Sequence, residues 1–428
     1  MHLTNLFMVS LNIILLALVV IGVAASSSSD RKTSDFRPVD QVIHDAIKDG
    51  AFPGAVILIA SKDGIMYQNA YGSHTYSASA PSMRLSTLFD LASVTKVIAT
   101  TTAVAQLYQK KILDLDMKVG GMFPEFNNHG KDIITLRHLL LHNSGFKPDP
   151  VPGFHTQTFG CPESAKKHPQ LSFSCLSQIY DGIMNQPLMN PVGAKYVYSD
   201  LSMMTAHLMI GRATKIHNLV SESDLRKDCP TGQRGEEACY YEAYVRKYVL
   251  QSLNLKVSGF LPPHSEWSNC APAWNETGSY RHELIQGFVS DPNSYANGGI
   301  MGHAGLFSTT GETFEVLKAW MYQAPGEDYI SEATAKLFST VANVTQSSRA
   351  LGWDTNSDGY GSCGHLSPST FLHLGYTGTQ VCNDPERGII TMLFTNRVYP
   401  TAENTKIGKV RSNFNDAVLC SLEKKYCE

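Results

Sequence analysis

The sequence carries little charge, and the two signs nearly balance. Charged residues make up 17% of the 428 residues, and the formal net charge at pH 7 is -3. Nucleic acids and anionic membrane surfaces select strongly basic faces, so neither is expected as a partner. Hydrophobic residues make up 43% of the chain, which is ample material for a globular core. By length alone, one large domain, one domain with an insertion, and two domains are all possible.

Several signatures of common sites are missing. No Cys-x-x-Cys occurs, so zinc and thioredoxin-like redox sites have no support. No Gly-x-Ser-x-Gly occurs, which leaves an α/β-hydrolase nucleophile unsupported. Residues 359–364 match the spacing of a dinucleotide fingerprint, but they lack a preceding strand and a following helix. His138 and His142 are spaced i, i+4 without an acidic third ligand, so we favour packing and capping roles over a metal site. We expect no metal, nucleotide or flavin cofactor.

Long apolar runs are also scarce, and the one that exists lies at the N-terminus. Residues 7–25 are apolar, end in small residues, and precede a polar leader over 26–38. We therefore predict a cleaved secretory signal over 1–25 and a secreted or lumenal protein. An uncleaved anchor is the alternative, because the run is nearly long enough to span a bilayer and only His2 supplies a basic group before it.

All nine cysteines follow this segment, and a secreted protein keeps cysteines paired by default. The local pairs that fit are Cys161/Cys175, Cys229/Cys239, Cys363/Cys382 and Cys420/Cys427. Cys270 is then the odd one, although sequence alone does not fix the connectivity. Acceptor sequons at Asn275 and Asn343 fit a glycosylated protein.

Strand signals occur at both ends of the chain, with helical signals between them. The expected elements are a helix over 39–48, a hairpin over 54–60 and 64–71, a helix entered through Thr135, a hairpin over 378–383 and 388–396, and a closing helix over 411–422. This order predicts an α/β layer built from both chain ends with a helical region inserted. Residues 150–190 and 221–285 resemble long disulfide-pinned loops. The Gly-rich stretch 298–307 serves either tight backbone packing or substrate contact.

The segment around Ser93 carries the strongest chemical signal. It opens an apolar stretch that continues to Tyr108 without a polar face, which predicts a helix buried in the domain. Ser93 and Lys96 are neighbours on one face of its first turn. We expect the desolvated amine to have a depressed pKa, and such an amine activates a serine without a histidine. Three other Ser-x-x-Lys matches lie in polar settings.

Two later segments complete the candidate site. Residues 191–200 form a turn, an extended run and a polar step into a helix, a junction at which Tyr198 can point its phenol into a cleft. The Tyr-x-Asn pattern also begins at Tyr67 and Tyr295, so this pattern alone is weak. Residues 373–378 start a strand beside a Gly-lined edge.

The ordered set of Ser-x-x-Lys, Tyr-x-Asn/Asp and Lys/His-x-Gly resembles the serine β-lactamase and penicillin-binding family, specifically the class C β-lactamase-like serine hydrolases. Supporting matches are Leu136–Leu140 with Ser144–Gly145, Gly298–Gly305, and Asp384–Pro385 before Thr395–Arg397. The resemblance implies an α+β fold in a single domain over 39–428. Its antiparallel sheet is flanked by helices, and an all-helical lobe spans roughly 100–345.

The same resemblance implies roles at matching positions. Ser93 would be the nucleophile, and Lys96 with Tyr198 would move its proton. The backbone N–H groups of Ser93 and Tyr376 would form the oxyanion hole. His373 and Gly375 would lie on the strand facing the substrate.

Three departures from the family pattern bear on the substrate. Asp200 stands where the family usually has Asn, and a carboxylate cannot donate a hydrogen bond to a substrate carbonyl. His373 and Leu374 replace the Lys-Thr pair that would hold a substrate carboxylate; lowering the pH should charge the imidazole.

We therefore expect a hydrolase of small or medium esters acting through an acyl-enzyme. The alternatives are an amidase or D-amino-acid peptidase, a weak β-lactamase, or a catalytically weak binding member of the family.

Overall fold

The computed structural model describes residues 34–161, 173–276, 280–323 and 329–427. The predicted signal or anchor, and most of the predicted leader, lie outside these residues. Residues 35–428 group into one compact unit. Within the described ranges, no helix is both long and apolar enough to cross a membrane.

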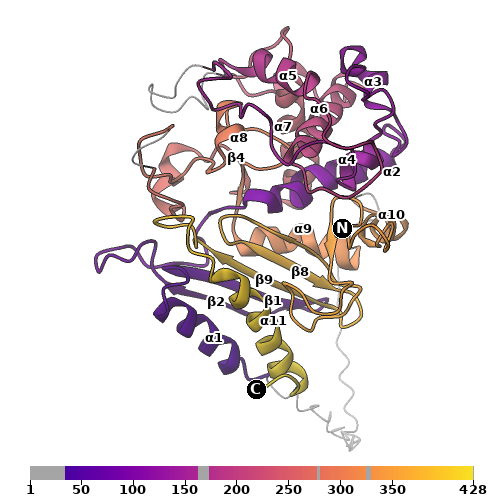
Figure 1. Ribbon diagram of the computed structural model, residues 1–428. Helices are drawn as coiled ribbons and strands as arrows, with labels where there is room; N and C mark the ends of the chain where they lie inside the picture. The colour runs from indigo at the N-terminus through magenta and orange to yellow at the C-terminus, as the bar shows by residue number, and fades with distance from the viewer. Residues whose placement is uncertain (1–33, 162–172, 277–279, 324–328, 428) are drawn as a thin grey trace, which may run out of the picture. The chain divides into compact units, whose positions relative to one another are not determined.

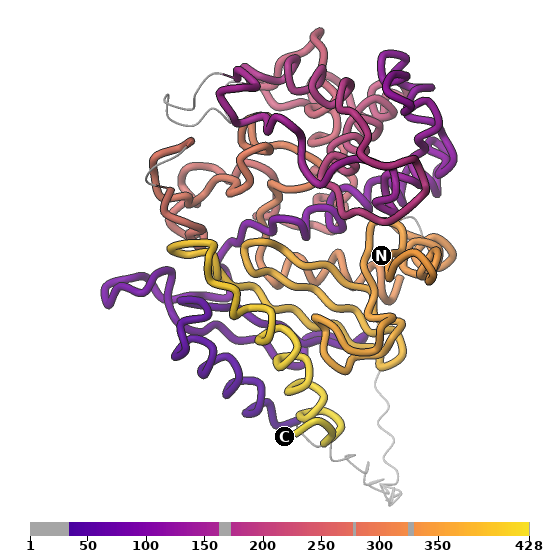
Figure 2. Tube along the Cα trace, in the orientation of Figure 1, coloured from indigo at the N-terminus to yellow at the C-terminus, as the bar shows by residue number. Residues whose placement is uncertain are grey.

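A six-stranded antiparallel sheet forms the centre of this unit. Its order is β2-β1-β9-β8-β7-β6. The strands are β1 (Gly54–Ser61), β2 (Gly64–Gly72), β6 (Asp354–Thr355), β7 (Phe371–Leu374), β8 (Gln380–Asp384) and β9 (Ile389–Thr395). Both predicted hairpins are confirmed, and β1 pairs directly with β9. The sheet is thus built from both chain ends, as Figure 2 shows by the contact of indigo and yellow segments.

Alternating side chains on β1 enter two different cores, because successive residues of a strand point to opposite faces. Ala55, Ile57 and Ile59 pack under the two terminal helices, α1 (Arg37–Lys48) and α11 (Ile407–Glu423). Val56 and Leu58 belong to the larger core on the other face. There α9 (Thr310–Tyr322) packs on β1 and β9, so it belongs to the sheet layer (Figure 1).

Helices between the two halves of the sheet gather at the top of the view in Figure 1. They are α2 (Thr102–Gln109), α3 (Val119–Met122), α4 (Leu136–Leu140), α5 (Leu176–Met184), α6 (Asp200–Ile216), α7 (Glu237–Tyr244) and α8 (Pro292–Ala296), with α10 (Glu332–Ser339) after α9. Short helical turns are η3 (Pro124–Phe126), η5 (Glu222–Asp224), η6 (Val245–Leu250), η7 (Gln251–Leu253) and η8 (His264–Asn269). A small antiparallel sheet, β3-β5-β4, joins Phe89–Asp90, Leu306–Ser308 and Gly259–Phe260. The fold is the predicted mixed α/β arrangement.

The four local cysteine pairs that the spacing favours are disulfides in the structure. They join Cys161 to Cys175, Cys229 to Cys239, Cys363 to Cys382, and Cys420 to Cys427. Cys270 is free and buried, as the pairing left it. The prediction that 150–190 and 221–285 are long loops is wrong in part: the disulfides are present, but the first range also holds α5, and the second holds α7, β4 and four short helical turns, η5, η6, η7 and η8.

Candidate active site

Ser93 lies at the start of the buried helical segment that the sequence predicts. It sits in a 3-10 turn, η1 (Ala92–Val94), which leads through the π-helical η2 (Lys96–Thr101) into α2. Ala92 adopts a φ of +46°, a left-handed conformation that costs an L-residue about 1–2 kcal/mol. Its N–H donates to the buried Asp90 carboxylate at 2.9 Å, which holds the strained turn in place. Ser93 is half-buried and faces a cleft.

The Lys96 amine is fully buried and has three polar contacts. It donates to Ser93 Oγ at 2.8 Å and to the His303 carbonyl at 3.0 Å, and it lies 2.7 Å from Asp200 Oδ1. Burial alone would lower the amine pKa, but the Asp200 carboxylate and Tyr198 outweigh it and raise the pKa above its usual value. The expected depressed pKa is therefore wrong. Asp200 holds Lys96 as an ammonium ion, and it also lines the cleft in which a substrate would bind.

Tyr198 ends the extended run before α6. Ser199 caps that helix, and its hydroxyl accepts a hydrogen bond from the Ser202 N–H at 3.3 Å. The Tyr198 ring packs on His142, with ring centroids 4.8 Å apart. The His142 Nδ1 lies 3.1 Å from the Ser199 backbone, and burial holds its pKa well below the usual value. His142 therefore packs against the tyrosine, as expected, while His138 caps α4 through Thr135.

The turn between β7 and β8 is tied to the nucleophile segment. Thr377 Oγ1 donates to the Asp90 carbonyl at 2.7 Å, and Thr379 Oγ1 donates to the Leu91 carbonyl at 2.9 Å. A Cβ on Gly375 would lie 1.9 Å from Thr379 Oγ1, so this close approach requires glycine. Tyr376 follows and lines the same cleft as Ser93.

His373 lies on β7 behind Tyr198, with the two ring centroids 6.2 Å apart. It is 3% exposed, and it is absent from the residues that line the cleft. Its Nδ1 lies 2.9 Å from the Leu374 carbonyl, which can only accept, so Nδ1 carries the proton. Burial, together with the Arg349 and Lys96 charges, holds its pKa well below the usual range. The expectation that mild acid charges His373 is therefore wrong.

Leu374 does not face the cleft either. Its side chain packs against the core beneath α1 and α11, on the opposite side of the strand from His373. β6 pairs with Phe371 and Leu372, and its ladder ends there. His373 and Leu374 thus lie on the part of β7 that no longer pairs with β6, and their side chains point to opposite faces of the sheet.

A cleft of about 550 Å³ opens above Ser93. Its walls include Asp149, Asp200, Asp291, His155, Tyr198, Trp274, His303 and Tyr376. Three carboxylates line it, whereas no lysine or arginine does. Asp149 is an exposed residue, but its carboxyl group is partly desolvated in the cleft. This desolvation, together with the nearby Asp200 and Asp291 carboxylates, raises the Asp149 pKa. Since Lys96 pairs with Asp200 and His303 pairs with Asp291, Asp149 is the cleft carboxyl without an ion-pair partner among the described residues.

His303 and Asp291 are wall residues that sequence reasoning missed as individuals. His303 Nε2 lies 2.9 Å from Asp291 Oδ1, and this pairing lowers the Asp291 pKa against the effect of burial. The Gly-rich stretch packs tightly on its neighbours, as one of the two expectations had it, and part of it also reaches the cleft. Gly302 packs so closely on α6 that a Cβ would lie 2.3 Å from the Met203 carbonyl, while His303 and Ala304 line the cleft.

Asp200, Asp291 and His303 place their ligand atoms within 4.8 Å of one another. Each carboxylate already has a partner, since Lys96 pairs with Asp200 and His303 pairs with Asp291. A divalent cation would have to displace a buried ammonium ion. We therefore do not assign a metal to this cluster.

Comparison with known proteins identifies the family to which this geometry belongs. The family model described as Beta-lactamase matches residues 39–412. The chain belongs to the beta-lactamase family. It is 29% identical over 390 residues to an N-acetylmuramyl-L-alanine amidase of Bacillus subtilis, covering 85% of this chain and 81% of the relative. It is 27% identical over 384 residues to a putative D-alanyl-D-alanine carboxypeptidase of Escherichia coli, covering 84% and 82%.

Solved structures with the beta-lactamase-family fold include EstCE1, described as a hydrolase with promiscuous acyltransferase activity. It aligns with a TM-score of 0.67 and 20% identity, covering 89% of this chain and 97% of that one. A penicillin-binding protein homologue from Caulobacter crescentus aligns with a TM-score of 0.64 and 17% identity, covering 90% and 97%. At these identities the alignments establish the fold. The chain is thus a member of a family of serine hydrolases with the beta-lactamase fold.

Proposed function

We propose that this protein is a secreted esterase that forms an acyl-enzyme on Ser93. The observation that carries the proposal is the contact between Lys96 Nζ and Ser93 Oγ at 2.8 Å, below a cleft large enough for a small ester. The four disulfides support an oxidising compartment. Amide or peptide bonds are the second candidate, favoured by the printed names of the amidase and carboxypeptidase relatives.

The charge of Lys96 decides how the proton moves. An ammonium ion has no lone pair, so it donates to Ser93 Oγ and does not deprotonate it. We assign proton acceptance to the phenolate form of Tyr198. Ser93 Oγ then attacks the ester carbonyl carbon, and the carbonyl oxygen accepts from the N–H groups of Ser93 and Tyr376. The bond to the leaving alkoxide breaks, and that alkoxide takes the proton from Tyr198.

Water completes the cycle by the same groups in the same order. It gives a proton to Tyr198 and attacks the acyl carbon. The bond to Ser93 Oγ then breaks, Tyr198 passes the proton to Ser93 Oγ, and the acid leaves. Among the described residues, the cleft lining offers an anionic substrate no lysine or arginine, and the buried neutral His373 supplies no counter-charge to it either. Neutral esters should therefore react faster than penicillins, cephalosporins or other carboxylate-bearing substrates.

Labelling with a fluorophosphonate tests the assignment. The full chain should be labelled on Ser93, as mapped by mass spectrometry, and should hydrolyse p-nitrophenyl acetate. Ser93→Ala should abolish both while changing the free energy of unfolding by less than about 1 kcal/mol, because one small half-buried hydroxyl is lost. Ser144→Ala, at another buried serine, is the matched control. Wild-type turnover by Ser93→Ala would rule out the acyl-enzyme, and a folded wild type without labelling or turnover would favour a binding protein.

A further inference from the structure

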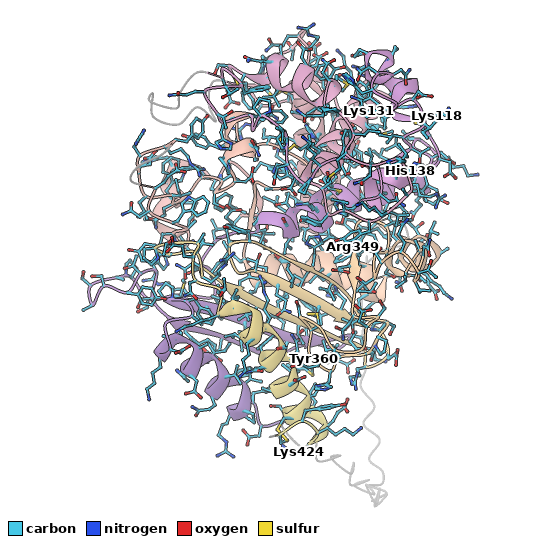
Figure 3. The ribbon with its side chains drawn as sticks, viewed as in Figure 1. Lys118, Lys131, His138, Arg349, Tyr360 and Lys424 are labelled. Atoms are coloured by element: carbon cyan, nitrogen blue, oxygen red, sulfur yellow. A yellow bond between two sulfur atoms is a disulfide. The ribbon has the colours of Figure 1, made fainter. Side chains whose placement is uncertain are left out.

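Two buried cations from different elements lie against the Tyr198 ring. The Lys96 ammonium nitrogen is 5.0 Å from the ring centroid, and the Arg349 guanidinium carbon is 5.2 Å from it. Lys96 has 0% of its side chain exposed and Arg349 has 9%. Figure 3 shows Arg349 between the sheet and the helices that cover it. Sequence reasoning missed this residue, which matches no motif.

The Arg349 side chain is held in place before any substrate binds. Its Nη2 lies 3.1 Å from Asp354 Oδ2, and its Nη1 lies 3.5 Å from His373 Nε2. Because His373 Nδ1 carries the proton, Nε2 accepts from the guanidinium. The loop before it is fixed by Gln346, which donates to the Gly193 carbonyl at 2.9 Å and accepts from Asn143 at 2.8 Å. The same loop thus contacts the segment that carries Tyr198.

The other titratable groups around Tyr198 supply no further positive charge. His142 and His373 are both held neutral by burial. Asp200 is paired with Lys96. On its far side the Arg349 guanidinium carbon is 5.4 Å from the Tyr196 ring, where burial raises the Tyr196 pKa despite the guanidinium. Two positive charges therefore lie beside Tyr198. The Asp200 carboxylate offsets the charge of Lys96, whereas Asp354 is partly exposed and offsets the charge of Arg349 only in part.

We propose that Arg349 is a positioning residue for Tyr198. Its guanidinium stabilises the negative charge of the Tyr198 phenolate, both before Tyr198 accepts the Ser93 proton and after Tyr198 has passed that proton on. This inference rests on the proposed esterase mechanism. Arg349 keeps all its protons throughout; the proton passes from Ser93 to Tyr198 and on to the leaving alkoxide. The family pattern places a lysine at the position of His373, and here a neutral imidazole stands there while Arg349 brings the charge from a different segment.

A role in binding a substrate carboxylate is the competing assignment. It is disfavoured because Arg349 is absent from the residues that line the cleft. The two assignments differ in which kinetic constant changes and for which substrate. Loss of a residue that binds a substrate carboxylate should raise KM for anionic substrates alone. Loss of a positive charge beside Tyr198 should instead lower kcat for every substrate and change the pH dependence of kcat.

The test compares Arg349→Gln and Arg349→Lys with wild type in the full chain. The substrates are p-nitrophenyl acetate and a p-nitrophenyl hemisuccinate, assayed from pH 5 to pH 9.5. Arg349→Gln should lower kcat at pH 7 by about 10- to 100-fold for both substrates with little change in KM. The acid limb of kcat/KM should move about one unit to higher pH, the size of effect that a nearby charge exerts on an ionisable group. Arg349→Lys should keep the wild-type limb.

Arg387→Gln is the matched control, because it removes another ion-paired arginine that lies outside the cleft lining. It should leave the acid limb where it is. Asp354→Asn provides a second test in case Arg349→Gln does not fold. It removes the carboxylate that offsets the Arg349 charge, so the acid limb should move to lower pH. An unchanged limb in both Arg349→Gln and Asp354→Asn would overturn the proposal, as would a loss confined to KM of the hemisuccinate. Turnover that survives Ser93→Ala would instead overturn the proposed function.

Discussion

The charge of Lys96 depends on one neighbouring residue. Asp200 raises the pKa of the amine, so the ammonium form persists to alkaline pH. A raised lysine pKa contributes stability that is fully present below the unfolded-state pKa and is lost as pH rises through the folded-state pKa. The ion pair therefore stabilises the protein across the neutral range. Its contribution disappears only in strong alkali.

Asp200→Asn restores the usual family residue and should expose this dependence. With the carboxylate gone, the Lys96 ammonium charge beside the Tyr198 ring is no longer offset, so the acid limb of kcat/KM should move about one unit to lower pH. The variant should also lose about 3–5 kcal/mol of stability at neutral pH, because a buried ammonium ion is left without its partner. Urea unfolding and pH–rate profiles measure the two effects. Asp116→Asn, which removes an exposed ion pair with Arg137, should show neither; identical profiles for all three proteins would contradict the assignment.

His373 governs a second residue-scale prediction, on substrate charge. Because burial holds its pKa well below the usual value, the imidazole stays neutral between pH 5.5 and pH 8. The ratio of kcat/KM for p-nitrophenyl acetate to that for its hemisuccinate should therefore stay constant over this window. His373→Lys should lower the ratio about 10-fold, because the longer side chain can extend toward the cleft and add a counter-charge for the carboxylate. His217→Lys, at the exposed residue that caps the C-terminus of α6, should not. A ratio that falls as pH drops in wild type but stays constant in His373→Gln would show that His373 titrates there.

At the scale of elements, Gly375 sets how closely β7 approaches the nucleophile segment. A Cβ there would lie 2.5 Å from the Leu91 carbonyl as well as against Thr379. Gly375→Ala should push the turn away from Ser93 and cost about 1–3 kcal/mol of stability. If this moves the Tyr376 N–H out of reach of the substrate oxygen, kcat should fall about 100- to 1,000-fold. Gly408→Ala on α11 meets no atom within 4 Å and is the control; equal activity of the two variants would remove Tyr376 from the oxyanion hole.

Element positions were largely predictable from local patterns. Both hairpins alternate or run apolar between turn residues, and Thr135 carries a capping signal that the structure confirms. The motif order placed Ser93, Lys96 and Tyr198 in one region by resemblance. Arg349 could not be found this way, because its position depends on a loop between α10 and β6 that has no periodic pattern.

Charge states were the least predictable property of the site. The sequence shows that Lys96 enters a buried helix, which alone implies a lowered pKa. It does not show that Asp200 approaches to 2.7 Å, and that single contact reverses the direction. Likewise, the pattern at His373 and Leu374 does not reveal which side of the sheet each residue faces. Such outcomes depend on tertiary distances of a few ångströms.

At the scale of the whole molecule, histidines with lowered pKa values make the fold sensitive to acid. His74 and His138 are among them, and the shift is larger for three others. Burial lowers the pKa of His142 and His373 well below the usual value, and that of His207 to about 3. Below pH 6.5 the unfolded chain protonates these rings while the folded chain does not. A depressed histidine pKa therefore contributes stability that is lost progressively as pH falls. His303 has a raised pKa and is protonated in both states in this range, so it does not offset the loss.

The free energy of unfolding should consequently fall between pH 6 and pH 4.5 by about 1.4 kcal/mol per pH unit for each of the three rings. His207→Gln isolates one of them: its ring packs on Tyr241 within the helices, outside the cleft lining. Because glutamine takes up no proton, this variant should reduce the slope by about 1.4 kcal/mol per pH unit, the contribution of one ring. His217→Gln changes an exposed histidine at the C-cap of the same helix and should preserve the wild-type slope. Urea unfolding at four pH values gives the slopes, and equal slopes for His207→Gln and wild type would show that His207 is protonated in the folded protein.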